Sequence, residues 1–499
     1  MFTWKKLAAL SLFTFIVLIV VGGHFSHHAG DPAGLATGAT SDFLTASGAK
    51  EVPVSQVGVN ALANEAGHLR VSINFTWTLI TGFLVLFMQV GFAFHFGGIA
   101  PVANLGGVGV LNSIKPAIAN WGLIGTKGFF LQSGHTYDVG VMCLFLFEVV
   151  FMETAGYIII GAIAERISFA GFIAAELLLG AIVYPIYGNW VWGGGFLAHL
   201  GQTYKLGHGA VDFAGSGVVH ATGGWIALAL AIHLGPRIGK FGKDGKPHAF
   251  PGHNLGYVVV GTLVLVFGWM GFNPGSTLGA TDLRISVVAV NTLLAACFGF
   301  VTAMAYTNAQ NGKPDISMAC NGMLAGLVAI TAPCAFVAPW AASIIGIVAG
   351  FLVCWSVAFW DRVKVDDPCG AISVHGVCGV WGVLSVGIFA DGTYGAGWNG
   401  ISGNVKGLLY GGASQLGAQV VDVIVGFAWA FGITYIAFLV IKQFVQIRVS
   451  ADVEIEGLDM PEFGAYCYPD FVLHPSTGNL AESDVMSTTA SRTTSPEPA

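Results

Sequence analysis

Two segments of the chain carry a histidine inside the same pattern, D-x-x-G-x-x-x-V-H-x-x-x-G. Residues 212–224 place His220 in it, and residues 367–379 place His375 in it. A neutral imidazole donates a hydrogen bond with one ring nitrogen and accepts one with the other, so it suits proton chemistry and small polar ligands. Because the pattern occurs twice in a very apolar chain, we predict a duplicated membrane domain with one histidine from each half.

Two other interpretations of these histidines compete with this one. A single histidine in an apolar helix most often serves packing, and it is the matched positions of His220 and His375 that favour a functional pair. A metal site needs more, because two histidines without a cysteine or a nearby third ligand leave the coordination incomplete. Two facing rings can instead share one hydrogen and line a narrow pore, so no metal and no cofactor are expected.

The composition of the chain indicates the medium that surrounds it. It has 499 residues, of which 55% are hydrophobic and only 9% charged, and its mean hydropathy is +0.73. A soluble domain carries about a quarter charged residues, so lipid must surround most of this one. The net charge is −7 without a basic stripe, which excludes a nucleic-acid partner. None of the eight cysteines forms a CxxC pair, so neither a zinc site nor a disulfide framework is predicted.

Apolar stretches of membrane-spanning length follow one another along the chain. The predicted spans cover residues 72–96, 139–163, 168–188, 214–234, 255–273, 286–308, 317–333, 338–360, 371–390 and 415–441. A further crossing is needed between residues 98 and 127 to keep the topology consistent, although that segment is glycine-rich and broken by two prolines. We therefore expect an all-α polytopic membrane protein with about 11 transmembrane helices.

Basic residues give the orientation of these spans. They fall in short loops, at Arg166, Arg237, Lys240, Lys243, Lys246, Lys313, Arg362, Lys364, Lys442 and Arg448. Because loops rich in Lys and Arg face the cytoplasm, the carboxyl terminus is predicted to be cytoplasmic in the plasma (inner) membrane.

The chain divides into four predicted regions. Residues 1–23 form a signal peptide or an amino-terminal anchor helix, and 24–70 form an extracytoplasmic loop segment. Residues 71–445 form the membrane domain. Residues 446–499 form a cytoplasmic carboxyl-terminal region that ends in a disordered Ser/Thr/Pro-rich tail.

Several motifs resemble those of the ammonium transporter family (Amt/Mep, related to the Rhesus proteins). The matching runs are DFAGSGVVH, GWMGFNPGS, GAIAERISF, KPDISMACNGMLAGLVAIT and VDDPCGAISVHGVCGVWGVLSVGIFADG. They occur in the order typical of the family, and the likeness extends over residues 72–460. The resemblance implies 11 helices with an inverted five-helix repeat and a homotrimer. The chain departs from the family around residues 97–125, where a basic stretch is missing and the second helix is short.

The resemblance also assigns a cation-binding site. It implies that Trp192, Phe147 and Ser276 hold ammonium at the outer face, since aromatic faces attract ammonium and a hydroxyl accepts one of its N–H bonds. Asp212 corresponds to an acidic residue beside this site, where its charge acts over a distance. The simpler interpretations are packing or interface aromatics and, for Asp212 and Asp367, helix N-caps. We take Asp367 as structural.

Below this site, the resemblance implies a gate and a pore. Phe151 and Phe272 form the gate, and His220 with His375 lines the pore. The resulting prediction is transport of ammonium without enzymatic activity: NH4+ is recruited, deprotonated, and NH3 passes the histidines before it is reprotonated inside.

The alternatives that remain open share the same scaffold. One is an ammonium sensor, against which we count the lack of a kinase or cyclase domain after residue 470. Another is a Rhesus-type gas channel, against which Trp192 and Ser276 argue because that branch lacks the pair. The expected partners are ammonium or ammonia, membrane lipid and two further copies of the chain. Docking of a PII-type regulator at the cytoplasmic face is a further candidate interaction that no local pattern supports.

Overall fold

The computed structural model describes residues 59–99 and 139–469, and within these ranges the chain is helical with no β-strand. The elements that make up the apolar helical segments are α2 (Val59–Ile99), α3 (Val139–Ile163), α4 (Phe169–Leu178), η4 (Leu179–Val183), α5 (Tyr184–Val191), η5 (Ser216–Ala221), α7 (Thr222–Leu234), α8 (Leu255–Phe272), α9 (Arg284–Asn311), α10 (Ile316–Thr331), α11 (Pro339–Arg362), η7 (Ile372–Val377), α12 (Cys378–Phe389) and α13 (Ala413–Ile441). Short pieces connect them, namely α6 (Leu200–Tyr204), η6 (Pro274–Thr277), η8 (Trp398–Gly400) and η9 (Leu408–Tyr410).

In these two ranges, 9 helical spans are long and apolar enough to cross a membrane, and α10 is a further, shorter apolar helix. All of the predicted spans except the crossing within 98–127 coincide with these helices. From residue 100 onward, that predicted crossing lies outside the described residues. Residues 1–58 and the tail from residue 470 lie outside them as well. The all-α polytopic fold is therefore confirmed.

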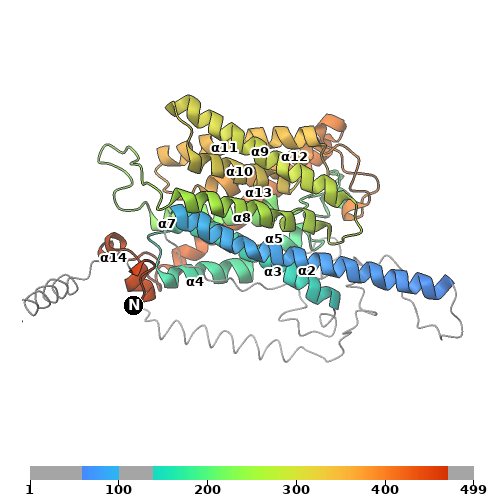
Figure 1. Ribbon diagram of the computed structural model, residues 1–499, viewed down its shortest axis with the longest axis horizontal. Coiled ribbons are helices and arrows are strands. Elements are labelled where there is room, and N and C mark those ends of the chain that lie inside the picture. Colours follow the sequence, from blue (N-terminus) through green and yellow to red (C-terminus); the bar gives the residue numbers. More distant parts are fainter. Residues whose placement is uncertain (1–58, 100–138, 470–499) are drawn as a thin grey trace, which may run out of the picture. The chain divides into compact units, whose positions relative to one another are not determined.

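Helix α2 differs from the sequence prediction. It begins at Val59, so residues 59–70, which were expected to belong to a loop segment, are helical. The sequence prediction missed this part of the helix because its residues are polar. A search for apolar stretches finds the membrane-spanning part of a helix but not a polar extension of it. In Figure 1, α2 runs alongside α8, and a Cβ at Gly268 would lie 2.2 Å from a side-chain carbon of Met88. A glycine on α8 thus permits this close contact.

The two copies of the histidine pattern fold in the same way. Gly215 and Gly370 have positive φ values of 109° and 75°, which only glycine adopts without strain. Each is followed within a residue or two by a π-helical turn, η5 or η7, that carries the histidine and continues into α7 or α12. π-Helical turns inside helices are frequent at functional sites, because they widen the helix and redirect side chains.

The glycines that follow the histidines bring the two halves together. A Cβ at Gly224 would lie 2.2 Å from the backbone nitrogen of Gly376, in the π-turn of the other half. Reciprocally, a Cβ at Gly379 would lie 2.5 Å from the carbonyl oxygen of Ser216 and 3.0 Å from the nitrogen of Ala221. Each half therefore places the last glycine of its pattern against the backbone of its counterpart, and no side chain fits between them.

An ion pair joins the halves near the carboxyl end of α7. The Arg237 guanidinium donates from Nε to Asp366 Oδ2 at 2.9 Å and from Nη2 to Oδ1 at 3.0 Å, and it also contacts Glu165. Burial alone would raise the pKa of Asp366, but the hydrogen bonds and charge of Arg237 outweigh it and hold that pKa below its ordinary value. The buried Arg166 donates to the Asp366 carbonyl at 2.8 Å.

The carboxyl-terminal residues from Ser450 form a separate compact unit. Its first helix, α14 (Ala451–Glu456), is capped by the Ser450 hydroxyl, which accepts from the Val453 amide. A π-helical turn, η10 (Asp459–Phe463), follows, and Asp459 accepts a hydrogen bond from the Cys467 amide at 2.8 Å.

Candidate functional site

Five aromatic rings form a continuous column through the membrane domain. The ring centroids of Phe147 and Phe151, one turn apart on α3, lie 4.6 Å apart. Phe151 stacks on Phe272 at 4.0 Å, Phe272 stacks on His220 at 5.2 Å, and His220 lies 5.3 Å from His375. All five side chains are buried. The structure thus brings together the predicted gate and the predicted pore residues in one line.

The two histidines contact each other directly. Their Nδ1 atoms are 3.3 Å apart, a contact that requires one ring to donate and the other to accept. The His220 ring also stacks on Trp269 with centroids 5.0 Å apart, and Trp269 is fixed by a hydrogen bond from its Nε1 to Thr331 Oγ1 at 3.0 Å. In the part of the chain that is described, His220 Nε2 is buried and has no hydrogen-bond partner. It is therefore available to a ligand inside the column.

Trp192 and Ser276 lie beside the gate residues Phe151 and Phe272 and are only half-buried. Trp192 contacts Phe151 edge to face, with centroids 6.4 Å apart. Its indole Nε1 donates to the Asp212 carbonyl oxygen at 2.7 Å, which fixes the ring. The Ser276 hydroxyl donates to the Phe272 carbonyl oxygen at 2.7 Å, so its oxygen still has lone pairs to offer. Aromatic faces and a hydroxyl acceptor are a suitable set for a small cation.

The Asp212 carboxylate is bound by backbone amides and not by the cation-site side chains. Its side chain is 1% exposed, and its two carboxylate oxygens accept four backbone N–H groups, from Gly215, Ser216, Gly217 and Val218, at 2.8 to 3.0 Å. Only an ionised carboxylate offers enough lone pairs for four donors. The carboxylate therefore caps η5 and can act on a cation through its charge, not through contact.

Asp367 repeats this cap in the second half. Its oxygens accept from the amides of Ala371 and Ile372 at 2.9 and 2.8 Å. The matching geometry explains why the pattern begins with aspartate in both copies, since each orphaned helix start needs an acceptor.

Sequence reasoning missed Trp269 and Thr331, which hold His220 in place. Both lie in apolar helices, and nothing in their spacing distinguishes them from packing residues. The signals were the run GWMGFNPGS, in which Trp269 stands three positions before Phe272, and the run KPDISMACNGMLAGLVAIT, which ends at Thr331.

A model of the ammonium transporter family matches residues 62–468 of the chain. The chain belongs to the ammonium transporter family. It is 48% identical over 418 residues to ammonium transporter Amt2 of Archaeoglobus fulgidus, covering 80% of this chain and 89% of that relative. It is 34% identical over 432 residues to ammonium transporter Amt1 of Haloferax mediterranei, covering 80% of each.

Solved structures of the family have the same fold. A structure described as a sensor Amt protein has a TM-score of 0.70 at 34% identity and covers 79% of this chain and 99% of its own. Mep2 of Saccharomyces cerevisiae has a TM-score of 0.66 at 28% identity, covering 76% and 88%. As an ammonium transporter family member, the chain is a multi-pass membrane protein and not an enzyme, and the predicted family and fold are confirmed.

Proposed function

We propose that this protein takes up NH4+ at Trp192, removes a proton, and conducts NH3 along the ring column past His220 and His375. The observation that carries the proposal is the column itself. It connects a half-exposed aromatic site to a buried pair of imidazoles whose Nδ1 atoms are 3.3 Å apart. Membership of the ammonium transporter family supplies the substrate.

Recruitment depends on the chemistry of the half-exposed end. The faces of Trp192 and Phe147 attract a cation electrostatically, and the Ser276 oxygen accepts one N–H bond. Asp212 adds a negative charge that is held nearby by four amides, and this charge acts over several ångströms in a medium of low dielectric. Together these groups offset part of the loss of water around the ion.

Deprotonation follows from the apolar lining beyond this site. A bare cation costs several kcal/mol or more to move into apolar surroundings, whereas neutral NH3 loses only its hydrogen bonds. The column offers no carboxylate to accompany the charge. We therefore assign the proton loss to the level of Phe151, before the histidines.

The gate has to move during each transport event. Phe151 and Phe272 stack with centroids 4.0 Å apart and 20° between their planes, so no molecule passes while both rings stay in place. Ring rotation about the side-chain bonds opens the passage, and aromatic rotamer changes of this kind need no helix motion.

The histidines offer NH3 the hydrogen bonds that the rest of the column lacks. His220 Nε2 has no protein partner in the described part of the chain and can donate to, or accept from, ammonia. After it passes the histidine pair, NH3 reaches water and is reprotonated.

We extend the proposal to the surroundings of the protein. Trp192 faces the outside of the plasma (inner) membrane, and the carboxyl terminus is cytoplasmic, as the basic loops indicate. The assembly is a homotrimer, and the cytoplasmic face is where a PII-type regulator would dock. The roles of Trp192, Ser276, Phe147, Asp212, Phe151, Phe272, His220 and His375 are part of this proposal.

Uptake of methylammonium by cells that lack their own carriers tests the function. We expect the full chain to raise uptake clearly above that of empty cells, and equal uptake would refute the proposal. High-affinity binding without flux would instead indicate a sensor. Flux that follows the neutral species across pH and ignores Trp192 substitution would indicate a gas channel.

A further inference from the structure

A phenol and a carboxyl group lie buried together outside the ring column. The hydroxyl of Tyr187, on α5, donates to Oδ1 of Asp422, on α13, at 2.8 Å. Asp422 is 0% exposed and Tyr187 is 2% exposed. In the described ranges, Asp422 Oδ2 has no hydrogen-bond partner. An ionisable group that is buried in a membrane helix with a free oxygen is costly, so it calls for a functional explanation.

This pair lies next to Asp212, with only Gly217 between them. A Cβ built on Gly217 would be 3.2 Å from Asp212 Oδ2 and 3.3 Å from the Tyr187 hydroxyl oxygen. A Cβ on Gly426 would be 2.6 Å from the same hydroxyl. Both glycines therefore keep open the space around the phenol, and Asp212, Tyr187 and Asp422 follow one another from the cation site into the bundle.

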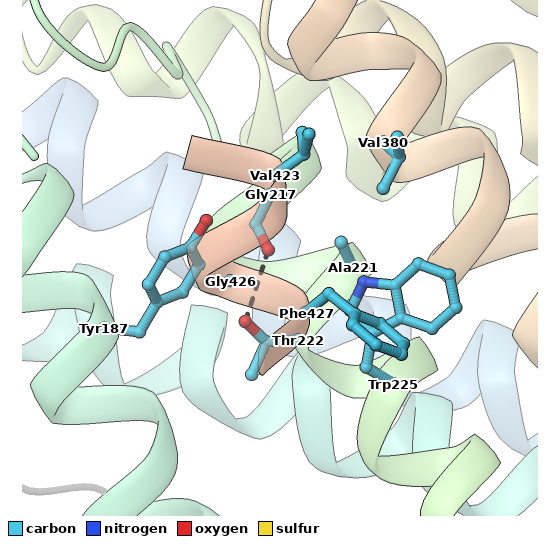
Figure 2. A pocket seen from close by; sticks show the side chains of 9 residues that line it. All are labelled: Tyr187, Gly217, Ala221, Thr222, Trp225, Val380, Val423, Gly426 and Phe427. Carbon is cyan, nitrogen blue, oxygen red and sulfur yellow. Dashed lines mark hydrogen bonds between the residues drawn. The ribbon is translucent and has the colours of Figure 1, made fainter. Parts of the chain in front are cut away.

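A small cavity adjoins this line of groups. Figure 2 shows the hydroxyl of Tyr187 directed toward Gly217 and Gly426, and the Thr222 hydroxyl bonded to the Gly217 carbonyl at 3.2 Å. Trp225 contributes apolar surface. The hydroxyls of Tyr187 and Thr222 and the Gly217 carbonyl give a single water molecule enough partners to be held here. Such a water would extend the hydrogen-bonded line at its centre.

We propose that Asp422 accepts the proton that ammonium loses, with the Tyr187 hydroxyl, which lies between Gly217 and Asp422, as the relay. This inference rests on the proposed function and adds a second route, used by the proton only. The N–H bond of NH4+ breaks, the electron pair stays on nitrogen, and NH3 enters the ring column. The proton passes through the water in this cavity to the Tyr187 oxygen, and Tyr187 gives its own hydroxyl proton to Asp422. Asp422 then releases that proton toward the inner side, so the carboxylate is restored and one proton crosses with each NH3. The positive charge of NH4+ is neutralised on the carboxylate.

A purely structural role would look different. A Tyr–Asp contact that only joins α5 to α13 would be expected to satisfy both carboxylate oxygens, because an orphaned buried oxygen costs about 1–3 kcal/mol. The hydroxyl of Thr434, farther along the same buried face of α13, is also without a partner in the described chain, but it carries no titratable proton. Thr434 is therefore a matched control for the loss of a buried polar group.

The consequence is that charge enters the protein with each ammonia. In proteoliposomes that contain the full chain, the current after an ammonium jump and the uptake of radiolabelled methylammonium can be measured on one preparation. In Asp422→Asn the proton lost by ammonium can only return to the outer side, so NH3 enters without charge. We therefore expect the charge moved per substrate to fall about tenfold while uptake stays within about twofold. Tyr187→Phe is expected to lower the same ratio, and Thr434→Val to leave it unchanged.

The possible outcomes separate this inference from the function. No uptake by the wild-type protein refutes the proposed function. Uptake without charge movement, or an unchanged ratio in Asp422→Asn, refutes the proton route and leaves the function standing. Equal loss of charge and uptake in a variant that keeps the wild-type melting temperature also refutes the route. If Asp422→Asn does not fold, Tyr187→Phe, which deletes one hydroxyl, decides by the same ratio.

Discussion

His220 contacts His375 through the Nδ1 atoms of both rings, which lie 3.3 Å apart. Each ring projects from a π-helical turn that follows a left-handed glycine and an aspartate cap. The two copies of the pattern therefore contact each other inside the membrane domain. The contact is possible because the backbones of the two halves approach closely at Gly224 and Gly376.

Loss of a pore imidazole should slow transport. In the variant His220→Leu, the side chain keeps a similar size but offers ammonia no hydrogen bond, which is worth about 1.5 kcal/mol or roughly tenfold in rate. Initial rates of methylammonium uptake measure this. His233→Asn is the control, because His233 lies on the same helix and bonds the Tyr435 carbonyl outside the column. A wild-type rate in His220→Leu would contradict the pore role.

Removal of the indole at the recruitment site should weaken substrate capture. Trp192→Leu is expected to raise the KM for ammonium about tenfold, because a cation–π contact is worth about 1–2 kcal/mol. Competition of ammonium with labelled methylammonium gives this KM. Trp340→Leu removes an indole that is half-exposed elsewhere, and its KM should stay at the wild-type value. Equal KM values in both variants would exclude Trp192 from the cation site.

Truncation of a gate ring should relax selectivity. Phe151→Ala removes the ring that stacks on Phe272, so larger amines such as dimethylammonium should enter at a relative rate about tenfold higher. The ratio of dimethylammonium to methylammonium uptake measures the effect. Phe438→Ala creates a comparable buried gap on α13, away from the column, and should keep the wild-type ratio. A similar ratio in all three proteins would show that the rings do not select.

The contact between the halves leaves no room for a methyl group. Gly224→Ala would place a Cβ 2.2 Å from the Gly376 nitrogen, and since backbone cannot give way easily, we expect a loss of at least about 2–3 kcal/mol of unfolding free energy. Thermal unfolding in detergent is the measurement. Gly432→Ala is the control, because a Cβ there meets no atom within 4 Å, and it should be neutral or slightly stabilising.

The Arg237–Asp366 pair should make stability depend on acid pH. The pKa of Asp366 is lower in the folded protein than in the unfolded chain, so its stabilisation is present above the unfolded value of about 3.9 and is lost as pH falls through the folded value. At neutral pH, Asp366→Asn should cost about 3–5 kcal/mol, because it leaves Arg237 without its buried partner.

Melting temperatures of the two proteins between pH 7 and about pH 3 test this dependence. The difference between wild type and Asp366→Asn should shrink as the solution becomes more acid. Asp244→Asn removes an exposed partner of Lys246 and should change stability by less than about 1 kcal/mol. A difference that stays constant over the whole pH range would refute the assignment.

The sequence by itself determined the local structure of the site. A repeated aspartate, glycine and histidine at fixed spacing predicted two capped helix starts, because Asp212 and Asp367 supply acceptors where a helix lacks them. The same repeat predicted two matched halves, and the motifs around it identified the family. These properties depend on residues close together in the chain, so their spacing carries the information.

The tertiary structure decided which side chains meet. Membrane helices that are apolar on every side have no amphipathic periodicity to reveal their neighbours. The stacking of Phe272 on His220, the support from Trp269 and the pairing of Tyr187 with Asp422 therefore depend on helix packing between segments far apart in sequence. That packing is set by close contacts such as the one at Gly224. No pattern in the sequence around Gly224 identifies the residue that it contacts.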